Sequence, residues 1–150
     1  MSLENLLRIG KLKAHAADEI ELTRLSQSAA RALGDAAQPV LSSDSRFKLA
    51  YGAVLQAALA VMLAKGYRPP TSEPGHHQLL IQALTLTLGL PRERVQVLEA
   101  YRKARNKSDY HGVPISDVVA AECVEDALRL VADVRAGLRL KRDDQSPEMP

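Results

Sequence analysis

Residues 45–67 read SRFKLAYGAVLQAALAVMLAKGY, and this long run of small and apolar side chains sets the architecture expected for the chain. Helical spacing places eight of its residues on an inward face: Phe47, Ala50, Tyr51, Val54, Leu55, Ala58, Val61 and Met62. The most apolar part, residues 49–64, contains Gln56 and is shorter than the roughly 20 residues that span a bilayer. We therefore interpret it as a buried helix rather than a membrane span, and Gly66 is suited to end it.

The composition of the whole chain favours helices. Among 150 residues there are 23 Leu and 22 Ala, against 5 aromatic residues and no Trp. Leu and Ala are strong helix formers, and the excess of Val, Ile and aromatic residues expected of strands is missing. This composition therefore argues against an all-β sandwich or barrel. The single cysteine, Cys123, excludes an intramolecular disulfide and a zinc site built from several cysteines.

Apolar periodicity predicts helices along almost the entire sequence. A short helix over residues 3–9 is followed by longer ones, which we expect at about 15–37, 44–65, 76–88, 91–110 and 116–138. Residues 67–75, YRPPTSEPG, form an irregular connection. The predicted fold is all-α, an antiparallel bundle of four or five helices in one domain over residues 1–140, with a flexible C-terminal tail at 141–150. The segment 76–88 is apolar nearly all round, which places it at the centre or at a subunit interface.

The first residues, MSLENLLRIG, have neither a basic start nor a small-residue cleavage site. They give no sign of export. We expect a cytoplasmic protein without a membrane segment.

Positive charge is concentrated in one part of the chain. The formal net charge is +2, but residues 92–107 carry six basic and two acidic side chains, a local charge of +4. Within this segment Val95, Leu98 and Tyr101 form an inward stripe, and a further step of four residues reaches Arg105. A guanidinium turned toward a helical bundle requires a partner. Asp109, one turn on, or an acidic residue of another helix would supply it.

The pair Arg105-Asn106 followed by His111 resembles the signature of HEPN domains (higher eukaryotes and prokaryotes nucleotide-binding). That signature is an Arg, usually a polar residue, and a His a few positions on. The order of the helices agrees, including the GHH sequence that opens the segment 76–88 and the motif near the end of the next helix. The resemblance covers roughly residues 45–138.

The resemblance implies an RNA-directed activity. Many HEPN proteins are metal-independent endoribonucleases, and many are toxins encoded beside an antitoxin such as a small nucleotidyltransferase. Two subunits then bring their motifs together, so the resemblance implies a homodimer, an RNA substrate and no cofactor or metal. It assigns proton transfer to His111 and phosphate stabilisation to Arg105, with Asn106 in support. Arg102, Lys103 and Lys107 would add sequence-independent attraction to RNA.

The spacing of the motif departs from the commonest pattern. Five residues separate Arg105 from His111, whereas the frequent form has four and would place the catalytic group at position 110, a Tyr here. His111 could meet Arg105 if the helix unwinds before Gly112. The alternative is that Tyr110 holds the catalytic position and the domain is a non-catalytic interaction or nucleotide-binding module that has lost nuclease activity. The polar run between them, including Asp109, would then only organise the helix end.

Three further residues have more than one interpretation. His76 and His77 follow Pro74-Gly75 at a predicted helix start, where they could cap or pack, support an RNA site or, least favoured, bind metal. Neighbouring helical residues diverge by about 100°, which makes joint chelation poor. Cys123 lies on an apolar stripe, where a buried thiol is favoured over a nucleophile.

Overall fold

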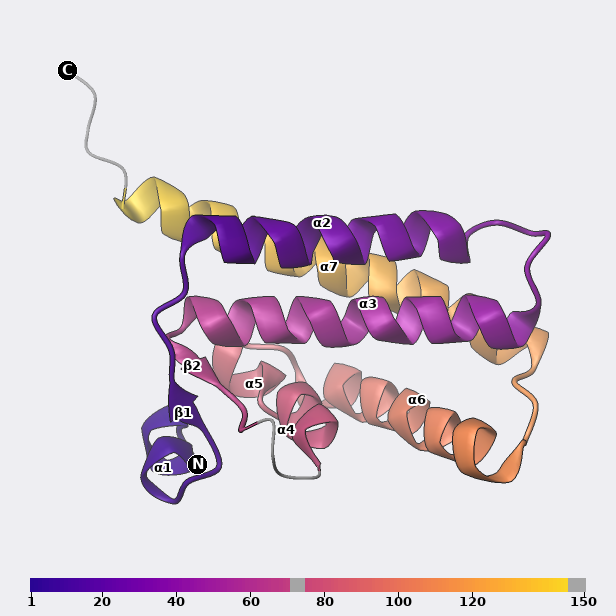
Figure 1. Ribbon diagram of the computed structural model, residues 1–150, viewed down its shortest axis with the longest axis horizontal. Helices are drawn as coiled ribbons and strands as arrows, with labels where there is room; N and C mark the ends of the chain where they lie inside the picture. The colour runs from indigo at the N-terminus through magenta and orange to yellow at the C-terminus, as the bar shows by residue number, and fades with distance from the viewer. Residues whose placement is uncertain (71–74, 146–150) are drawn as a thin grey trace.

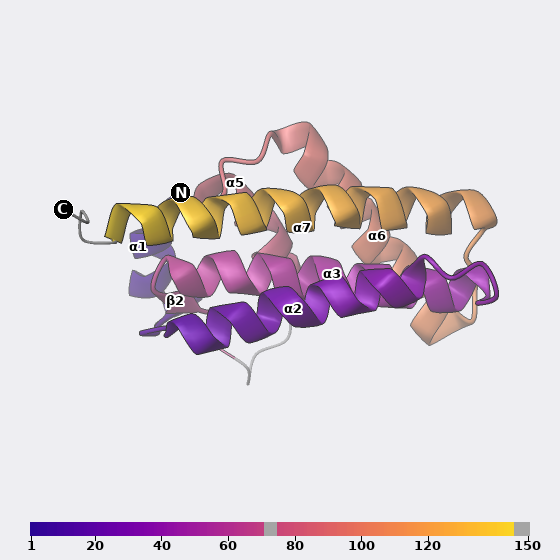
Figure 2. The same cartoon turned by 90° about the horizontal axis from the view of Figure 1, so that it is seen from above.

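Three long helices form the body of the protein. A computed structural model describes residues 1–70 and 75–145, with side chains through residue 139. In it α2 (Glu19–Ala36) and α7 (Asp117–Gln145) both pack against α3 (Ser43–Ala64), as Figure 1 and Figure 2 show. The chain is 74% helical with one very small sheet, which confirms the predicted all-α bundle.

The remaining elements are short except for one helix. They are α1 (Leu3–Arg8), β1 (Lys13–Ala14), β2 (Tyr67–Arg68), α4 (His76–Gln82), α5 (Leu84–Thr87) and the longer α6 (Arg92–His111). In Figure 1, α4, α5 and α6 lie on the side of α3 away from α2 and α7, and all three contact α3. Because α3 has neighbours on both sides, it forms the centre of the bundle.

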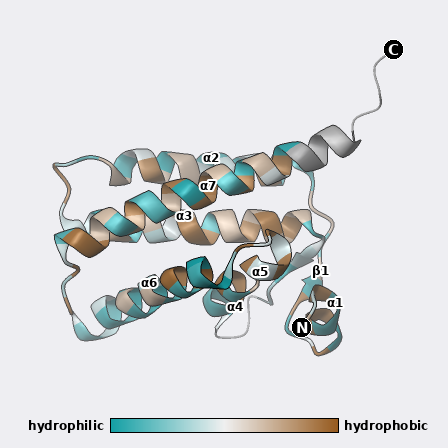
Figure 3. Ribbon diagram, turned by 180° about the vertical axis from the view of Figure 1, so that it is seen from behind, coloured by the Kyte–Doolittle hydropathy of each residue, from teal (hydrophilic) through white to brown (hydrophobic). Residues whose placement is uncertain are grey.

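The apolar sequence of α3 is explained by this central position. Of its residues, 12 are buried, including Phe47, Tyr51 and Met62. Among the described helices α3 alone is long and apolar enough to cross a membrane, because an 18-residue stretch of it has a mean hydropathy of 1.7. However, 67% of that stretch is buried inside the bundle. This burial agrees with the interpretation of residues 49–64 as a core helix. In Figure 3 the apolar C-terminal half of α3 contrasts with the hydrophilic C-terminal half of α6.

Contacts at one end of the bundle fix the direction of the helices. The Ser43 hydroxyl donates to Asp117, and the Ile115 N–H donates to Asp44 Oδ1 at 2.8 Å. The first turns of α3 and α7 are therefore neighbours, and these two helices run in the same direction, whereas α2 and α6 run the opposite way (Figure 1). The bundle is consequently not antiparallel throughout.

The start of α2 differs from the prediction. The helix begins at Glu19 and not near residue 15, because the Asp18 carboxylate accepts the Glu21 N–H at 2.8 Å and caps it. The residues before it form β1, which pairs antiparallel with β2 in the register Lys13 to Arg68 and Ala14 to Tyr67. This pairing, between segments far apart in sequence, was not predicted.

Two other predicted helices also have different limits. The segment 76–88 is not one helix, because it breaks at Ala83 into α4 and α5. Its sequence contains no Gly or Pro that would signal a break. At the C-terminus α7 continues to Gln145, past the predicted end at residue 138. The expected tail at 141–150 thus begins inside this helix, and residues 146–150 lie outside the described residues.

Candidate functional site

Helix α6 presents the predicted stripe to the bundle. Val95, Leu98 and Tyr101 are buried, and the Tyr101 hydroxyl donates to the Asp126 carboxylate of α7. One helical step further, Arg105 continues the same face at the point where α6 passes α4 and α3. The apolar stripe therefore positions a guanidinium at the junction of three helices.

The guanidinium of Arg105 has the intrahelical partner that the sequence predicts. Its Nε lies 3.1 Å from Asp109 Oδ2, in an ion pair one turn along the helix. The other carboxylate oxygen of Asp109 lies 3.8 Å from the Lys48 ammonium of α3. Asp109 therefore holds Arg105 from its own helix and links α6 to the start of α3.

Two further contacts come from other helices. The Cζ atom of Arg105 lies 5.7 Å from the centroid of the Tyr51 ring, in cation–π geometry. Its Nη1 lies 3.4 Å from Nδ1 of His77, the second residue of α4. We call Arg105, Asp109, His77 and Tyr51 the Arg105 cluster.

The pKa of His77 is lowered below the ordinary 6.5 by burial first, and then by the positive charges of His76, Arg105 and Arg102. The ring is therefore neutral at pH 7. Since a guanidinium N–H can only donate, Nδ1 of His77 accepts, and the ring proton is placed on Nε2. The cluster thus contains a neutral imidazole beside a fixed cation.

Tyr51 closes the inner side of the cluster. Its ring is 2% exposed and stacks on Phe47 with a centroid separation of 6.2 Å. Burial raises the pKa of its hydroxyl to about 12, although Arg105 and Arg102 act in the opposite direction. This hydroxyl is buried without a hydrogen-bond partner among the described residues. Tyr51 therefore bounds the cluster with an apolar side chain, and its ring face contacts the Arg105 guanidinium.

His111 lies away from this cluster. Helix α6 is regular through His111, its last residue, and Gly112 ends it with φ +66°. The N–H of Gly112 donates to Ser108 O at 3.1 Å and that of Val113 donates to Lys107 O at 3.3 Å. The helix therefore does not unwind before Gly112, and the condition under which His111 could meet Arg105 within one chain is not met.

The regular helix separates the two motif residues in one chain. Six helical positions correspond to roughly 600° of rotation, which leaves the two side chains about 120° apart, and to a rise of about 9 Å. Arg105 faces α3 and α4, whereas His111 and Tyr110 are exposed, Tyr110 at 79%. A single chain thus does not bring Arg105 together with either residue.

The other predicted RNA-contacting residues differ in availability. Arg102 forms a bidentate contact with Glu99, the closest distance being 2.9 Å, and its side chain is only 17% exposed. Its charge is therefore compensated. Lys103 and Lys107 are exposed, and Asn106 is half-buried.

The residues that sequence reasoning assigned to packing complete the cluster. Tyr51 was expected in the core, and packing was the favoured role of His77 over support of an RNA site. His77 does pack on Tyr51, at a centroid distance of 6.4 Å, but it also contacts Arg105. The only sequence signal was the position of His77 in the GHH segment.

Neither a metal-ligand cluster nor a similarity to a known protein identifies the function of this site. Within residues 1–70 and 75–139, no three side chains of His, Cys, Asp or Glu gather as a metal site would require. No protein-family model and no curated protein matches the sequence. The motif and the geometry of the cluster are therefore the features that point to a function.

Proposed function

We propose that this protein is an RNA-directed domain of the HEPN type that binds an RNA phosphate at the Arg105 cluster. The observation that carries the proposal is the contact between the Arg105 guanidinium and the neutral imidazole of His77. The contact joins the residue of the HEPN-like motif to a second group able to bind a phosphate oxygen.

The hydrogen-bonding capacity of Arg105 supports phosphate binding. Nε of Arg105 is paired with Asp109, and its Nη1 is in contact with His77. The hydrogens on its Nη2 have no partner among the described residues. The side chain is 33% exposed, which leaves it accessible to a ligand. Guanidinium N–H groups match the oxygens of a phosphate. The ring proton on Nε2 of His77 is a further donor.

We also propose that a homodimer of this protein cleaves RNA without a metal. Cleavage needs a base that removes the proton of a ribose 2′-hydroxyl. The resulting oxygen attacks the phosphorus, the bond to the 5′-oxygen breaks, and that oxygen takes a proton, leaving a cyclic phosphate and a 5′-hydroxyl. Since His111 diverges from Arg105 within one chain, a second copy would have to bring its His111 to the cluster.

The divergence of His111 favours a second candidate function. A chain whose exposed His111 never meets Arg105 would bind RNA, a nucleotide or a partner protein without cleaving RNA. Under either function we propose that the domain acts in the cytoplasm. The resemblance to HEPN proteins suggests a toxin–antitoxin pair with a small nucleotidyltransferase as its context.

The test is RNA binding and cleavage by the purified full chain in EDTA. Fluorescence anisotropy with a labelled single-stranded RNA should show binding that falls at least tenfold in Arg105→Gln. The matched control is Arg31→Gln, which removes an exposed positive charge from α2, outside the cluster. Equal binding by the Arg105→Gln variant would overturn the proposal of phosphate binding.

Cleavage is read separately, from the products on a denaturing gel. Nuclease function requires cyclic phosphate ends in EDTA, and their loss in His111→Asn. Intact RNA in the presence of tight binding would establish the non-catalytic function. Sedimentation of the same sample shows whether a dimer forms, and a strictly monomeric protein that cleaves RNA would contradict the two-copy arrangement.

A further inference from the structure

A second candidate site lies at the far end of the bundle from His111. Helices α2 and α7 pack closely on α3 but contact each other much less. Figure 2 shows them diverging toward the end where α2 begins and α7 ends. A pocket of about 620 Å³ opens there, between α2, the last turn of α3 and α7. Its size lies within the usual range of small-molecule sites.

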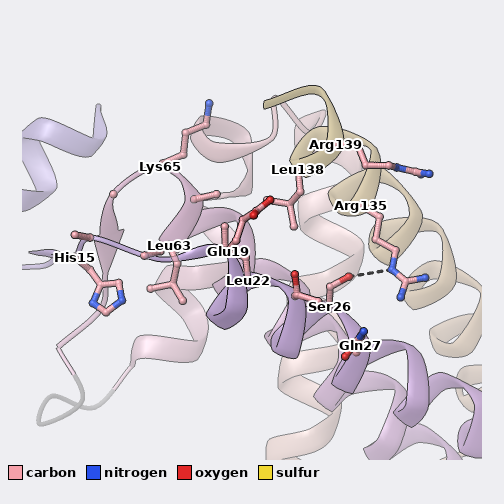
Figure 4. Close-up of a pocket in the computed structure, with 15 residues that line it drawn as sticks. His15, Glu19, Leu22, Ser26, Gln27, Leu63, Lys65, Arg135, Leu138 and Arg139 are labelled. Atoms are coloured by element: carbon pink, nitrogen blue, oxygen red, sulfur yellow. Dashed lines mark hydrogen bonds between the residues drawn. The ribbon is translucent and has the colours of Figure 1, made fainter. Parts of the chain in front are cut away.

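The floor of this pocket is apolar. Leu63 and Ala64 of α3 form it, and the half-buried Leu22 of α2 and Leu138 of α7 flank it (Figure 4). Leu63 and Ala64 are already buried, so an aliphatic chain placed on this floor would cover the remaining exposed surface of Leu22 and Leu138. Its own apolar surface would also leave water, which favours binding by about 25 cal/mol per Å² of apolar area covered. The floor is therefore suited to a hydrocarbon body.

The rim of the pocket is cationic. Lys65, Arg135 and Arg139 all line it, against one acidic residue, Glu19. Figure 4 shows Lys65 and Arg139 extended on either side of Leu138 in that view. This charge balance favours an anionic ligand over a cationic one.

Arg135 is the cation with a defined position in the pocket. Its Nε donates to Ser26 Oγ at 2.9 Å across the gap between α7 and α2, as the dashed line in Figure 4 marks. The guanidinium retains four other N–H groups that can bind a carboxylate. The Ser26 contact holds this fork at the α2–α7 side of the pocket before a ligand enters.

We propose that this pocket binds an amphipathic organic anion, with an aliphatic chain on Leu63 and Ala64 and its carboxylate at Arg135 and Arg139. The pocket shares no residue with the Arg105 cluster. This inference is therefore independent of the proposed RNA function.

The test compares three probes of equal chain length on the full chain. Decanoate, decanol and decyltrimethylammonium are titrated below their aggregation limits, at pH 8, by isothermal calorimetry. Decanoate should bind at one site, at least tenfold more tightly than either other probe. The double variant Arg135→Gln/Arg139→Gln should weaken decanoate binding at least tenfold and leave decanol binding unchanged.

Two further variants separate occupation of this pocket from surface adsorption. Thr23→Trp adds bulk at an exposed lining position of α2 and should abolish decanoate binding without changing the circular dichroism spectrum. Arg31→Gln, on the same helix but outside the pocket, should bind decanoate as the original protein does. Equal affinity for decanoate and decanol, undiminished binding by Thr23→Trp, or association of two chains in place of ligand binding would each overturn the proposal.

Discussion

Arg105 lies against His77 of α4, with 3.4 Å between Nη1 and Nδ1, although the two residues are 28 positions apart in the sequence. His111, the residue paired with Arg105 in the motif, is exposed at the end of α6. The Arg–imidazole pair within one chain is therefore formed between helices and not along the motif helix. Any role of His111 at Arg105 requires a second molecule.

The lowered pKa of His77 predicts a loss of stability in acid. The unfolded His77 binds a proton near pH 6.5, whereas the folded residue resists it to lower pH. The free energy of unfolding therefore falls as the pH drops below 6.5, until the folded residue is also protonated. His77→Gln should remove this part of the pH dependence in urea titrations between pH 7.5 and 4.5.

The control for His77 is Gln78→Ala, at an exposed position of the same helix. It should keep the pH dependence of the original protein, apart from a constant offset. If His77→Gln showed the same pH dependence as the original protein, His77 would not be the group that resists protonation.

Replacement of Tyr51 and of Tyr101 by Phe should have opposite effects on the stability of the protein. Tyr51→Phe removes a buried hydroxyl without a partner and should stabilise the protein by about 1 kcal/mol. Tyr101→Phe removes the hydroxyl that donates to Asp126 and should destabilise it by about 1–3 kcal/mol. Urea unfolding at pH 7 measures both, and a Tyr51→Phe protein less stable than the original would show that this hydroxyl has a partner in solution.

Replacement of two glycines by Ala should have opposite effects on the stability of the protein. Gly112 ends α6 at φ +66°, a left-handed conformation that strains any residue with a Cβ. Gly112→Ala should therefore destabilise the protein by about 1 kcal/mol. Gly34 is inside α2, and a Cβ there meets nothing within 4 Å, so Gly34→Ala should stabilise it by about 0.5–1 kcal/mol. Thermal melts of the two variants should shift in opposite directions, and a Gly112→Ala protein that melts no lower than the original would contradict this description of the α6 C-terminus.

The thiol of Cys123 is predicted to be inert in the folded protein. Its side chain is fully buried, and burial raises its pKa to about 12, with a smaller contribution from Asp126. Because the thiolate is the reactive form, a disulfide reagent at pH 8 should modify Cys123 only as fast as the protein unfolds. Reaction at the rate of a free thiol in native buffer would show that α7 opens locally at this position.

Much of the fold follows from local patterns. The stripe Val95, Leu98 and Tyr101 is buried as helical spacing predicts, and Ser116 caps α7 by accepting the Val119 N–H at 3.2 Å. The Arg105–Asp109 pair is also local, because residues four apart meet on one helix face. The start of α2 was predictable as well, since Asp18 followed by Glu21 is a capping pattern.

The contact of Arg105 with His77 and Tyr51, by contrast, depends on how α3, α4 and α6 pack. The same holds for the break at Ala83, where no residue type signals an interruption, and for the pairing of β1 with β2. The pocket above Leu63 exists because α2 and α7 diverge over α3. The sequence by itself determined which residues form helices and which faces are buried, since those depend on neighbours within a few positions. Only the tertiary structure decided which side chains meet at the two candidate sites, because those contacts join residues of different helices and depend on how the helices pack.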